Sequence, residues 1–270
     1  MILGIDASNI KTGGGLTHLQ NILEHADPEL LGITKVIVWG GRNSLEYLPE
    51  KTWLDLREIK RLNQPLYKRL LWQQTELHKL SSKSCDLLFV PGGLYLGGFR
   101  PYVTMFQNMQ IFEAKERNRE RFSMGWFRLR LLKSAQSITF RESSGLICLS
   151  EYARNYLTQY HSDVISKIPV QMIAHGTDNL NYEHPSSINE SSDNQRILRI
   201  LYVSTVKKYK HQWNLIDAVG LLRKEEGTSI ELHLIGAGDT HALRLMEESL
   251  QRNDPEQRYI FYHGSLPHKE

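Results

Sequence analysis

Residues 200–238, ILYVSTVKKYKHQWNLIDAVGLLRKEEGTSIELHLIGAG, decide the fold of this chain. An apolar strand runs into a turn with three lysines, and a helix and a second apolar strand ending in glycines follow. Strands that are joined through a helix pair in parallel, and such a unit opens a Rossmann-like domain. Because the sequence stops at Glu270, we expect only the first part of this domain within it.

The same alternation of strands and helices fills the region before this stretch. Strand-like runs occur at residues 2–6, 36–39, 54–59, 87–90, 103–106, 146–149 and 170–174, with helical patterns at 15–26, 66–80 and 151–160. Residues 179–195 are polar and without periodicity, which is typical of a linker or long loop. The sequence therefore predicts an α/β protein with two Rossmann-like domains and parallel sheets, the first at 1–190 and the incomplete second at 191–270.

Composition excludes several classes of protein. Hydrophobic residues make up 40% of the chain, as in soluble globular proteins, and a net charge of +3 gives no surplus of cations for nucleic-acid binding. Cys85 and Cys148 lie in apolar runs, where we expect small buried hydrophobic side chains in a reducing cytoplasm. No apolar run of about 18 residues and no signal sequence is found. The predicted location is cytoplasmic.

A glycine loop separates the first strand from the first helix, at Thr12 and then Gly13, Gly14 and Gly15. Glycines let a ligand approach the backbone closely, and the amides of a helix N-terminus favour anionic or polar oxygen groups. The loop is not a dinucleotide-binding motif, because His18 replaces the third glycine. We expect a ligand-contacting loop; the alternative is an ordinary flexible turn.

Lysines and glycines meet at one predicted sheet edge in the second domain. Lys207, Lys208 and Lys210 follow its first strand, and Gly236 and Gly238 follow its second. Ligands bind parallel sheets at this carboxyl edge, where a lysine can neutralise a diphosphate. The alternative for the lysines is a solvated turn.

These residues carry a resemblance to a known family. The segments YVSTVKKYKHQWNLIDAV and LHLIGAGD, with the glycine loop and VQMIAHGTD in the first domain, resemble the retaining glycosyltransferases of family 4, which have the two-domain GT-B fold. The resemblance spans nearly the whole chain. It implies transfer of a sugar, with retention, from a nucleotide-sugar donor to a glycan or lipid-linked acceptor in cell-surface polysaccharide or lipopolysaccharide biosynthesis.

The chain also departs from that family. Ser204 and Thr205 stand where many members have a Gly-Arg pair that binds the donor diphosphate, which leaves Lys210 as the predicted phosphate contact. The family's E-x7-E motif is expected beyond residue 270, so we expect a truncated donor domain. The alternatives are a non-catalytic remnant that binds sugar nucleotides or glycans, and another Rossmann-like enzyme such as a sugar-nucleotide epimerase.

Three further polar residues are candidates for the cleft of the first domain. Gln107 and Asn108 end a predicted strand and are expected to position the donor sugar or the acceptor, unless they form an ordinary polar strand exit. His175 follows another strand and is either a cleft or a structural histidine. No Asp-x-Asp pair and no zinc-binding motif occurs, so we predict no metal and no cofactor.

Residues 115–133, KERNRERFSMGWFRLRLLK, run from Lys115 to Lys133 and interleave basic with large apolar side chains. Such a helix can hold a protein on an anionic membrane surface. The alternative is a solvated helix packed on the core, because Glu113, Glu116 and Glu120 dilute the positive charge. The membrane interpretation predicts peripheral attachment to the inner face of the membrane and a lipid-linked acceptor.

Overall fold

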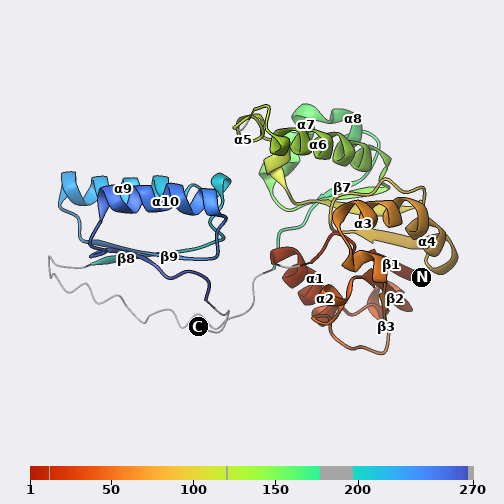
Figure 1. Cartoon of the computed structure of the whole chain (residues 1–270). Helices are drawn as coiled ribbons and strands as arrows, with labels where there is room; N and C mark the ends of the chain where they lie inside the picture. The colour runs from red at the N-terminus through yellow and green to blue at the C-terminus, as the bar shows by residue number, and fades with distance from the viewer. Residues whose placement is uncertain (12, 120, 177–196, 267–270) are drawn as a thin grey trace. The chain divides into compact units, whose positions relative to one another are not determined.

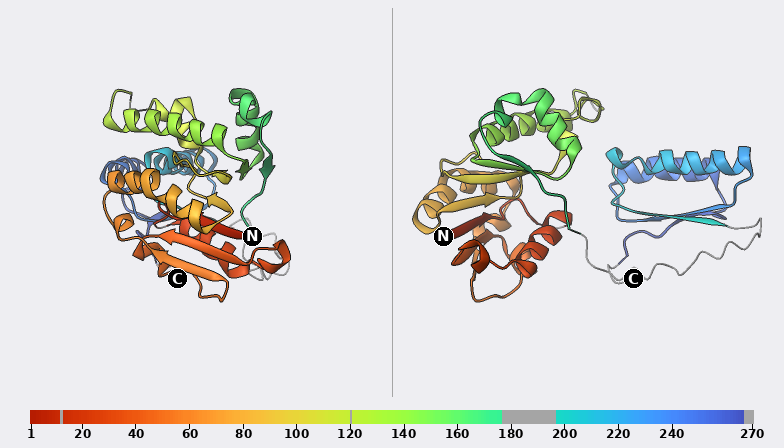
Figure 2. Two further views of the ribbon diagram at one scale, coloured as in Figure 1. Left: turned by 90° about the vertical axis from the view of Figure 1, so that its right-hand side faces the viewer. Right: turned by 180° about the vertical axis from the view of Figure 1, so that it is seen from behind.

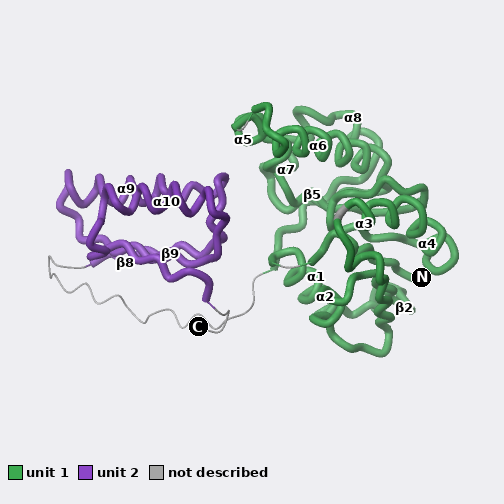
Figure 3. The backbone as a smooth tube through the Cα atoms, in the orientation of Figure 1, with its two compact units in different colours: residues 1–178 green, residues 179–270 purple. Residues whose placement is uncertain are grey.

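The chain folds into two compact units, Met1–Asp178 and Asn179–Glu270 (Figure 3). The computed structural model describes residues 1–11, 13–119, 121–176 and 197–266. The predicted domain boundary near residue 190 and the predicted linker at 179–195 lie outside the described residues. We call the two parts unit 1 and unit 2 and describe each by itself.

Unit 1 contains a parallel sheet of seven strands in the order β3-β2-β1-β4-β5-β6-β7 (Figure 1). Ile5 of β1 pairs with Val38 of β2 on one side and with Phe89 of β4 on the other. The chain order of the strands reverses between β1 and β4, which creates a topological switch point at the carboxyl edge of the sheet. The strands are β1 (Ile2–Asp6), β2 (Lys35–Gly40), β3 (Leu54–Glu58), β4 (Leu87–Val90), β5 (Tyr102–Phe106), β6 (Gly145–Cys148) and β7 (Val170–Met172).

Helices cover both faces of this sheet (Figure 2). The predicted helix at 66–80 is a continuous run of α3 (Leu66–Trp72), a π-helical turn η3 (Gln73–Leu77) and α4 (His78–Ser84). The other helices of unit 1 are α1 (Gly14–His25), α2 (Arg42–Leu45), α5 (Ala114–Arg117), α6 (Met124–Glu142), α7 (Glu151–Tyr160) and α8 (Ser162–Ile165), with 3₁₀ turns η1 (Glu29–Leu31), η2 (Lys60–Asn63) and η4 (Met109–Ile111).

Successive side chains of the strands belong to two separate hydrophobic cores, one on each face of the sheet. Val36 and Val38 of β2 pack with α1, whereas Ile37 and Trp39 pack with Trp72 at the end of α3. Successive side chains of a strand point to opposite faces, so α1 and α3 lie on opposite sides of the sheet. A third core joins β5 and β6 to α6 and α7.

Unit 2 contains three parallel strands in the order β10-β9-β8, formed by β8 (Leu198–Val203), β9 (Ile230–Ile235) and β10 (Ile260–Tyr262). Two helices, α9 (Gln212–Glu226) and α10 (Thr240–Asn253), lie side by side on one face (Figure 1). Their buried Ile216 and Met246 share a core with Leu232 and Leu234 of β9. The prediction of an α/β fold with two parallel sheets is confirmed.

Two details of the sequence prediction are wrong. Cys85, at the C-terminal end of α4, is only half-buried, whereas Cys148 is buried in β6 as expected. Burial raises the pKa of each thiol to about 11, so both are protonated at neutral pH. The strand predicted at 170–174 ends at Met172.

Candidate functional site

A cavity of about 700 Å³ opens between α3 and α6 in unit 1, and we call it the α3–α6 pocket. The loop after β1 contributes Asn9, Ile10 and Lys11, and the loop after β4 contributes Gly92 and Gly93. These two loops leave the sheet at its topological switch point. The pocket therefore occupies the position at which open α/β sheets bind their ligands.

Three of the predicted site residues line this pocket, namely Gly15, Gln107 and Asn108. The Asn108 side chain also has a structural role, because its Oδ1 accepts a hydrogen bond of 3.0 Å from the backbone N–H of Gln110. Gly15 belongs to the first turn of α1. Residues of the glycine loop and of the exit from β5, which are far apart in the sequence, thus line one pocket of unit 1.

The glycine loop borders open space. Gly13 has a φ of 70°, a backbone conformation that favours glycine, and it forms the N-cap of α1. A Cβ atom placed on Gly13, Gly14 or Gly15 would meet no atom of the described chain within 4 Å. Packing therefore does not require glycine at positions 14 and 15. Thr12, which the sequence places in the same loop, lies outside the described residues.

A polar network beneath the pocket was missed by sequence reasoning. Asp6, buried at the end of β1, accepts hydrogen bonds from the Ser8 backbone N–H at 2.9 Å and from the Gln73 side chain. Burial raises the pKa of Asp6, and these hydrogen bonds oppose that rise. Gln73 also donates to the Leu94 carbonyl at 2.8 Å. The network joins β1, η3 and the loop after β4, which together support the pocket.

His175 lies beside His18 of α1. Their Nδ1 atoms are 2.9 Å apart, and the rings meet edge to face at 4.3 Å between centroids. Burial and the neighbouring His175 lower the pKa of His18, so the neutral form is favoured. Two of the predicted features of unit 1, the glycine loop and His175, thus lie near the same end of α1. His18 stood out in the sequence only because it interrupts the glycine pattern.

In unit 2 the loops after β8 and β9 pair with each other. Val206 forms a parallel bridge with Gly238, and Lys207 Nζ lies 3.4 Å from Asp239 Oδ2. Asp239 caps α10 by accepting a hydrogen bond of 2.9 Å from the Ala242 N–H, and this bond is the main cause of its lowered pKa. Lys207 therefore has a structural partner within the unit.

Lys210 remains exposed at the end of the 3₁₀ turn η5 (Lys208–Lys210), just before α9. Its carbonyl accepts a hydrogen bond of 2.9 Å from the Tyr202 hydroxyl, and its ammonium group lies 5.4 Å from the centre of the Tyr209 ring. No carboxylate of the described residues lies within 4.0 Å of that ammonium group. Lys210 is thus held by its backbone while its side chain charge stays available to a ligand.

The glycines after β9 are explained by packing. Gly236 has a φ of 141°, and a Cβ there would lie 2.1 Å from the Ser204 carbonyl oxygen. A Cβ on Gly238 would lie 2.8 Å from Val206 and 2.7 Å from Leu243. Both glycines allow the loops after β8 and β9 to approach each other, so their residue type alone is no sign of a ligand.

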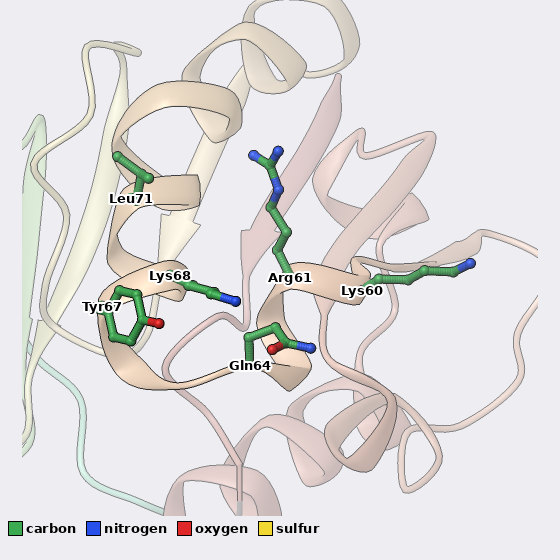
Figure 4. A pocket seen from close by; sticks show the side chains of 6 residues that line it. All are labelled: Lys60, Arg61, Gln64, Tyr67, Lys68 and Leu71. Carbon is green, nitrogen blue, oxygen red and sulfur yellow. The ribbon is translucent and has the colours of Figure 1, made fainter.

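A second pocket of about 570 Å³ lies between η2 and α3, at residues 60–71 (Figure 4). Lys60, Arg61 and Lys68 line it together with Gln64, Tyr67 and Leu71. Arg61 is paired with Glu76 of η3, whereas no carboxylate of the described residues pairs with Lys60 or Lys68. Two lysines without a carboxylate partner among the described residues thus lie beside this second pocket.

Residues 115–133 do not form one helix, because α5 ends at Arg117 and α6 begins at Met124. Several apolar side chains of this segment are exposed: Phe122 (70%), Met124 (85%), Phe127 (50%) and Leu131 (72%). Arg121 and Arg130 lie against the rings of Phe122 and Trp126. Glu116 pairs with Arg119, and Glu120 lies outside the described residues.

The described ranges, which exclude residues 12, 120, 177–196 and 267–270, contain neither a cluster of metal ligands nor a helix that could cross a membrane. Within them no three His, Cys, Asp or Glu residues gather as metal ligands would. None of the helices there combines the length and the apolar character that a membrane crossing requires.

Solved structures match the fold over nearly the whole chain. HepE from Anabaena, in complex with UDP, matches with a TM-score of 0.59 at 17% identity, over 98% of this chain and 69% of its own. WaaG, a glycosyltransferase involved in lipopolysaccharide biosynthesis, matches with a TM-score of 0.59 at 11% identity, over 98% of this chain and 70% of its own. A UDP-N-acetylglucosamine 2-epimerase from Rickettsia bellii matches with a TM-score of 0.50 at 14% identity, over 98% and 68%.

No protein-family model matches the sequence, and no curated protein matches it either. At these identities the solved structures establish the fold alone. The chain has a GT-B-like fold, and it is shorter than the glycosyltransferase structures that share it.

Proposed function

We propose that this chain belongs to a retaining glycosyltransferase, which transfers a sugar from a nucleotide-sugar donor to a glycan or lipid-linked acceptor in the synthesis of surface polysaccharide or lipopolysaccharide. The observation that supports it best is the match of 98% of the chain to GT-B structures, one of them with UDP bound and another from lipopolysaccharide biosynthesis. In both units the carboxyl edge of the sheet is suited to bind a ligand, which agrees with this proposal.

Unit 2 is the proposed donor side. Lys210, exposed at the N-terminal end of α9, would bind the diphosphate of the donor, and the positive end of the helix dipole would assist it. As the bond to the sugar breaks, negative charge grows on the leaving nucleoside diphosphate, and such fixed positive groups stabilise that charge. Gly236 and Gly238 would shape the adjoining loop, through which the backbone approaches the nucleotide.

Unit 1 is the proposed acceptor side. Gln107 and Asn108 would orient hydroxyl groups in the α3–α6 pocket, and the open glycine loop at Gly13–Gly15 would approach the ligand through its backbone. The exposed aromatic and basic side chains of residues 115–133 would hold the unit against an anionic membrane at its cytoplasmic face. That placement would bring the pocket to a lipid-linked acceptor.

The test begins with binding of UDP-, GDP- and ADP-sugars to the purified chain, measured by isothermal titration calorimetry. We expect one nucleotide class to bind, with Lys210→Ala weakening it and Lys224→Ala, an exposed lysine later in α9, leaving it unchanged. Absence of binding by every nucleotide sugar to a folded chain would refute the proposal.

Two alternatives also predict nucleotide-sugar binding and are separated by the product. A non-catalytic binding remnant would bind without turnover. A sugar-nucleotide epimerase, which the match to the Rickettsia bellii structure favours as second candidate, would return a changed sugar still attached to its nucleotide. Mass spectrometry and NMR of the products after incubation with acceptor extracts distinguish these outcomes from transfer.

A further inference from the structure

The α3–α6 pocket has a cationic part and an apolar part. Lys11, Arg69 and Arg128 contribute positive charge, and none of its described lining residues is Asp or Glu. Leu96, Phe127 and Leu131 contribute apolar surface from two different segments. A neutral sugar alone needs neither an excess of cations nor this amount of hydrocarbon.

Arg69 is the cation that the surrounding structure fixes most firmly. Its Nη1 donates a hydrogen bond of 2.9 Å to the Ser8 carbonyl, and its Nε is buried without a partner. No carboxylate of the described residues pairs with it. Burial lowers the pKa of Arg69, but a guanidinium group stays charged at neutral pH.

Asp6, the acid of the network beneath the pocket, forms no ion pair with Arg69. Its carboxyl group accepts hydrogen bonds from Gln73 and from the Ser8 backbone N–H instead. A partly desolvated cation without a counter-ion is unfavourable, and an anion from a ligand would relieve this cost. Because guanidinium groups bind phosphate and carboxylate in a planar, two-pronged geometry, Arg69 is suited to such a group.

The apolar part is a stripe along α6. Met124, Phe127 and Leu131 are spaced three and four residues apart, so they lie on one face of the helix. Their exposed fractions are 85%, 50% and 72%. All three line the pocket, which therefore continues from Arg69 onto a hydrocarbon surface.

We propose that the ligand of the α3–α6 pocket is an anionic amphiphile, with a phosphate or carboxylate at Arg69 and an aliphatic chain along Met124, Phe127 and Leu131. Identification of this ligand as the acceptor rests on the proposed function. The pocket then selects acceptors whose sugar is joined to lipid through a charged group.

The test compares farnesyl phosphate with farnesol, which have the same chain and differ in the charged group, by titration calorimetry on the full chain. We expect farnesyl phosphate to bind at least about tenfold more tightly. Arg69→Gln should remove this preference and Arg69→Lys should keep part of it, whereas Leu131→Ser should weaken both ligands. Arg154→Gln, an exposed arginine of α7 outside the pocket, is the matched control.

Equal affinity for the two ligands, or unchanged farnesyl phosphate binding by a folded Arg69→Gln variant, would overturn the proposal. Sedimentation with phosphatidylglycerol and phosphatidylcholine vesicles identifies the source of the anion. If Arg69→Gln reduces binding to anionic vesicles but not to farnesyl phosphate, the site holds a membrane headgroup and the acceptor assignment is wrong. No nucleotide sugar enters these assays, so their failure and failure of the proposed function are separate results.

Discussion

Two glycine loops lie at the carboxyl edges of the two sheets, and they use glycine for opposite reasons. In unit 1, Gly14 and Gly15 border open space, where an added Cβ would meet nothing within 4 Å. In unit 2, Gly236 and Gly238 are surrounded by the backbone and side chains of neighbouring loops. The first loop leaves room for a ligand, whereas the second uses its missing side chains to bring two loops together. A glycine-rich strand exit therefore does not by itself identify a binding site.

The largest effect is expected from Gly236→Ala. The new Cβ would lie 2.1 Å from the Ser204 carbonyl oxygen, at a φ of 141° that L-residues rarely adopt. We expect unit 2 to lose about 3 kcal/mol or more of its free energy of unfolding. Hydrogen exchange of β8 and β9 measures this loss. Gly227→Ala, with positive φ but open space around it, should cost only about 1 kcal/mol; equal losses would show that backbone strain, not the close approach, requires Gly236.

The second largest effect is expected at Lys210, the exposed cation at the end of η5 in unit 2. Lys210→Ala should weaken nucleotide-sugar binding by roughly 1.5 to 3 kcal/mol, because a charged hydrogen bond to the diphosphate is lost. Calorimetry against Lys224→Ala measures it. Unchanged affinity would assign the donor phosphate to another group and leave unit 2 with a packed loop and a solvated lysine.

Sequence patterns predicted the strands and the position of both glycine loops. This succeeded because the periodicity of apolar residues and the placement of glycines are local features that can be read from neighbouring positions. The strand run at 103–106 and the helix at 151–160 agree with β5 and α7. What the patterns did not predict depends on contacts across the fold. Arg69 reaches Ser8 over 61 positions, and His175 reaches His18 over 157.

Local signals for these contacts were nevertheless present. Asp6 is an acidic residue at the end of an otherwise apolar strand, and Arg69 and Gln73 lie four positions apart in a helix with buried Trp72. Residues at this spacing lie on one face of a helix, so both side chains are expected to reach the same neighbouring part of the fold. The partner itself, however, is chosen by the sheet order, which a single sequence does not reveal. The close approach of Ser204 to Gly236 likewise depends on how the strands pair in the folded unit.

The third effect tests the open loop. Gly15→Ala should leave unit 1 unchanged or up to about 1 kcal/mol more stable, because alanine is favoured over glycine within α1. Binding of farnesyl phosphate should fall by about tenfold, because the methyl group enters the pocket that Gly15 lines. Thermal unfolding and calorimetry measure the two quantities on one variant. A stability loss without an affinity loss would make the unit 1 loop a packed loop like that of unit 2.

The smallest effect is a pH dependence at His18, in the first turns of α1. The pKa of His18 lies below its ordinary value of 6.5, chiefly through burial, so folding favours the neutral ring. The contribution to stability is therefore present above pH 6.5 and is lost as the pH falls through the lower, folded-state pKa. His18→Gln should flatten this decline in urea unfolding of unit 1, and His25→Gln, exposed in the last turn of α1, should not. If both variants decline like the original chain, the pair of histidines beside the open loop contributes no proton-linked stability, and its role there is confined to the contact itself.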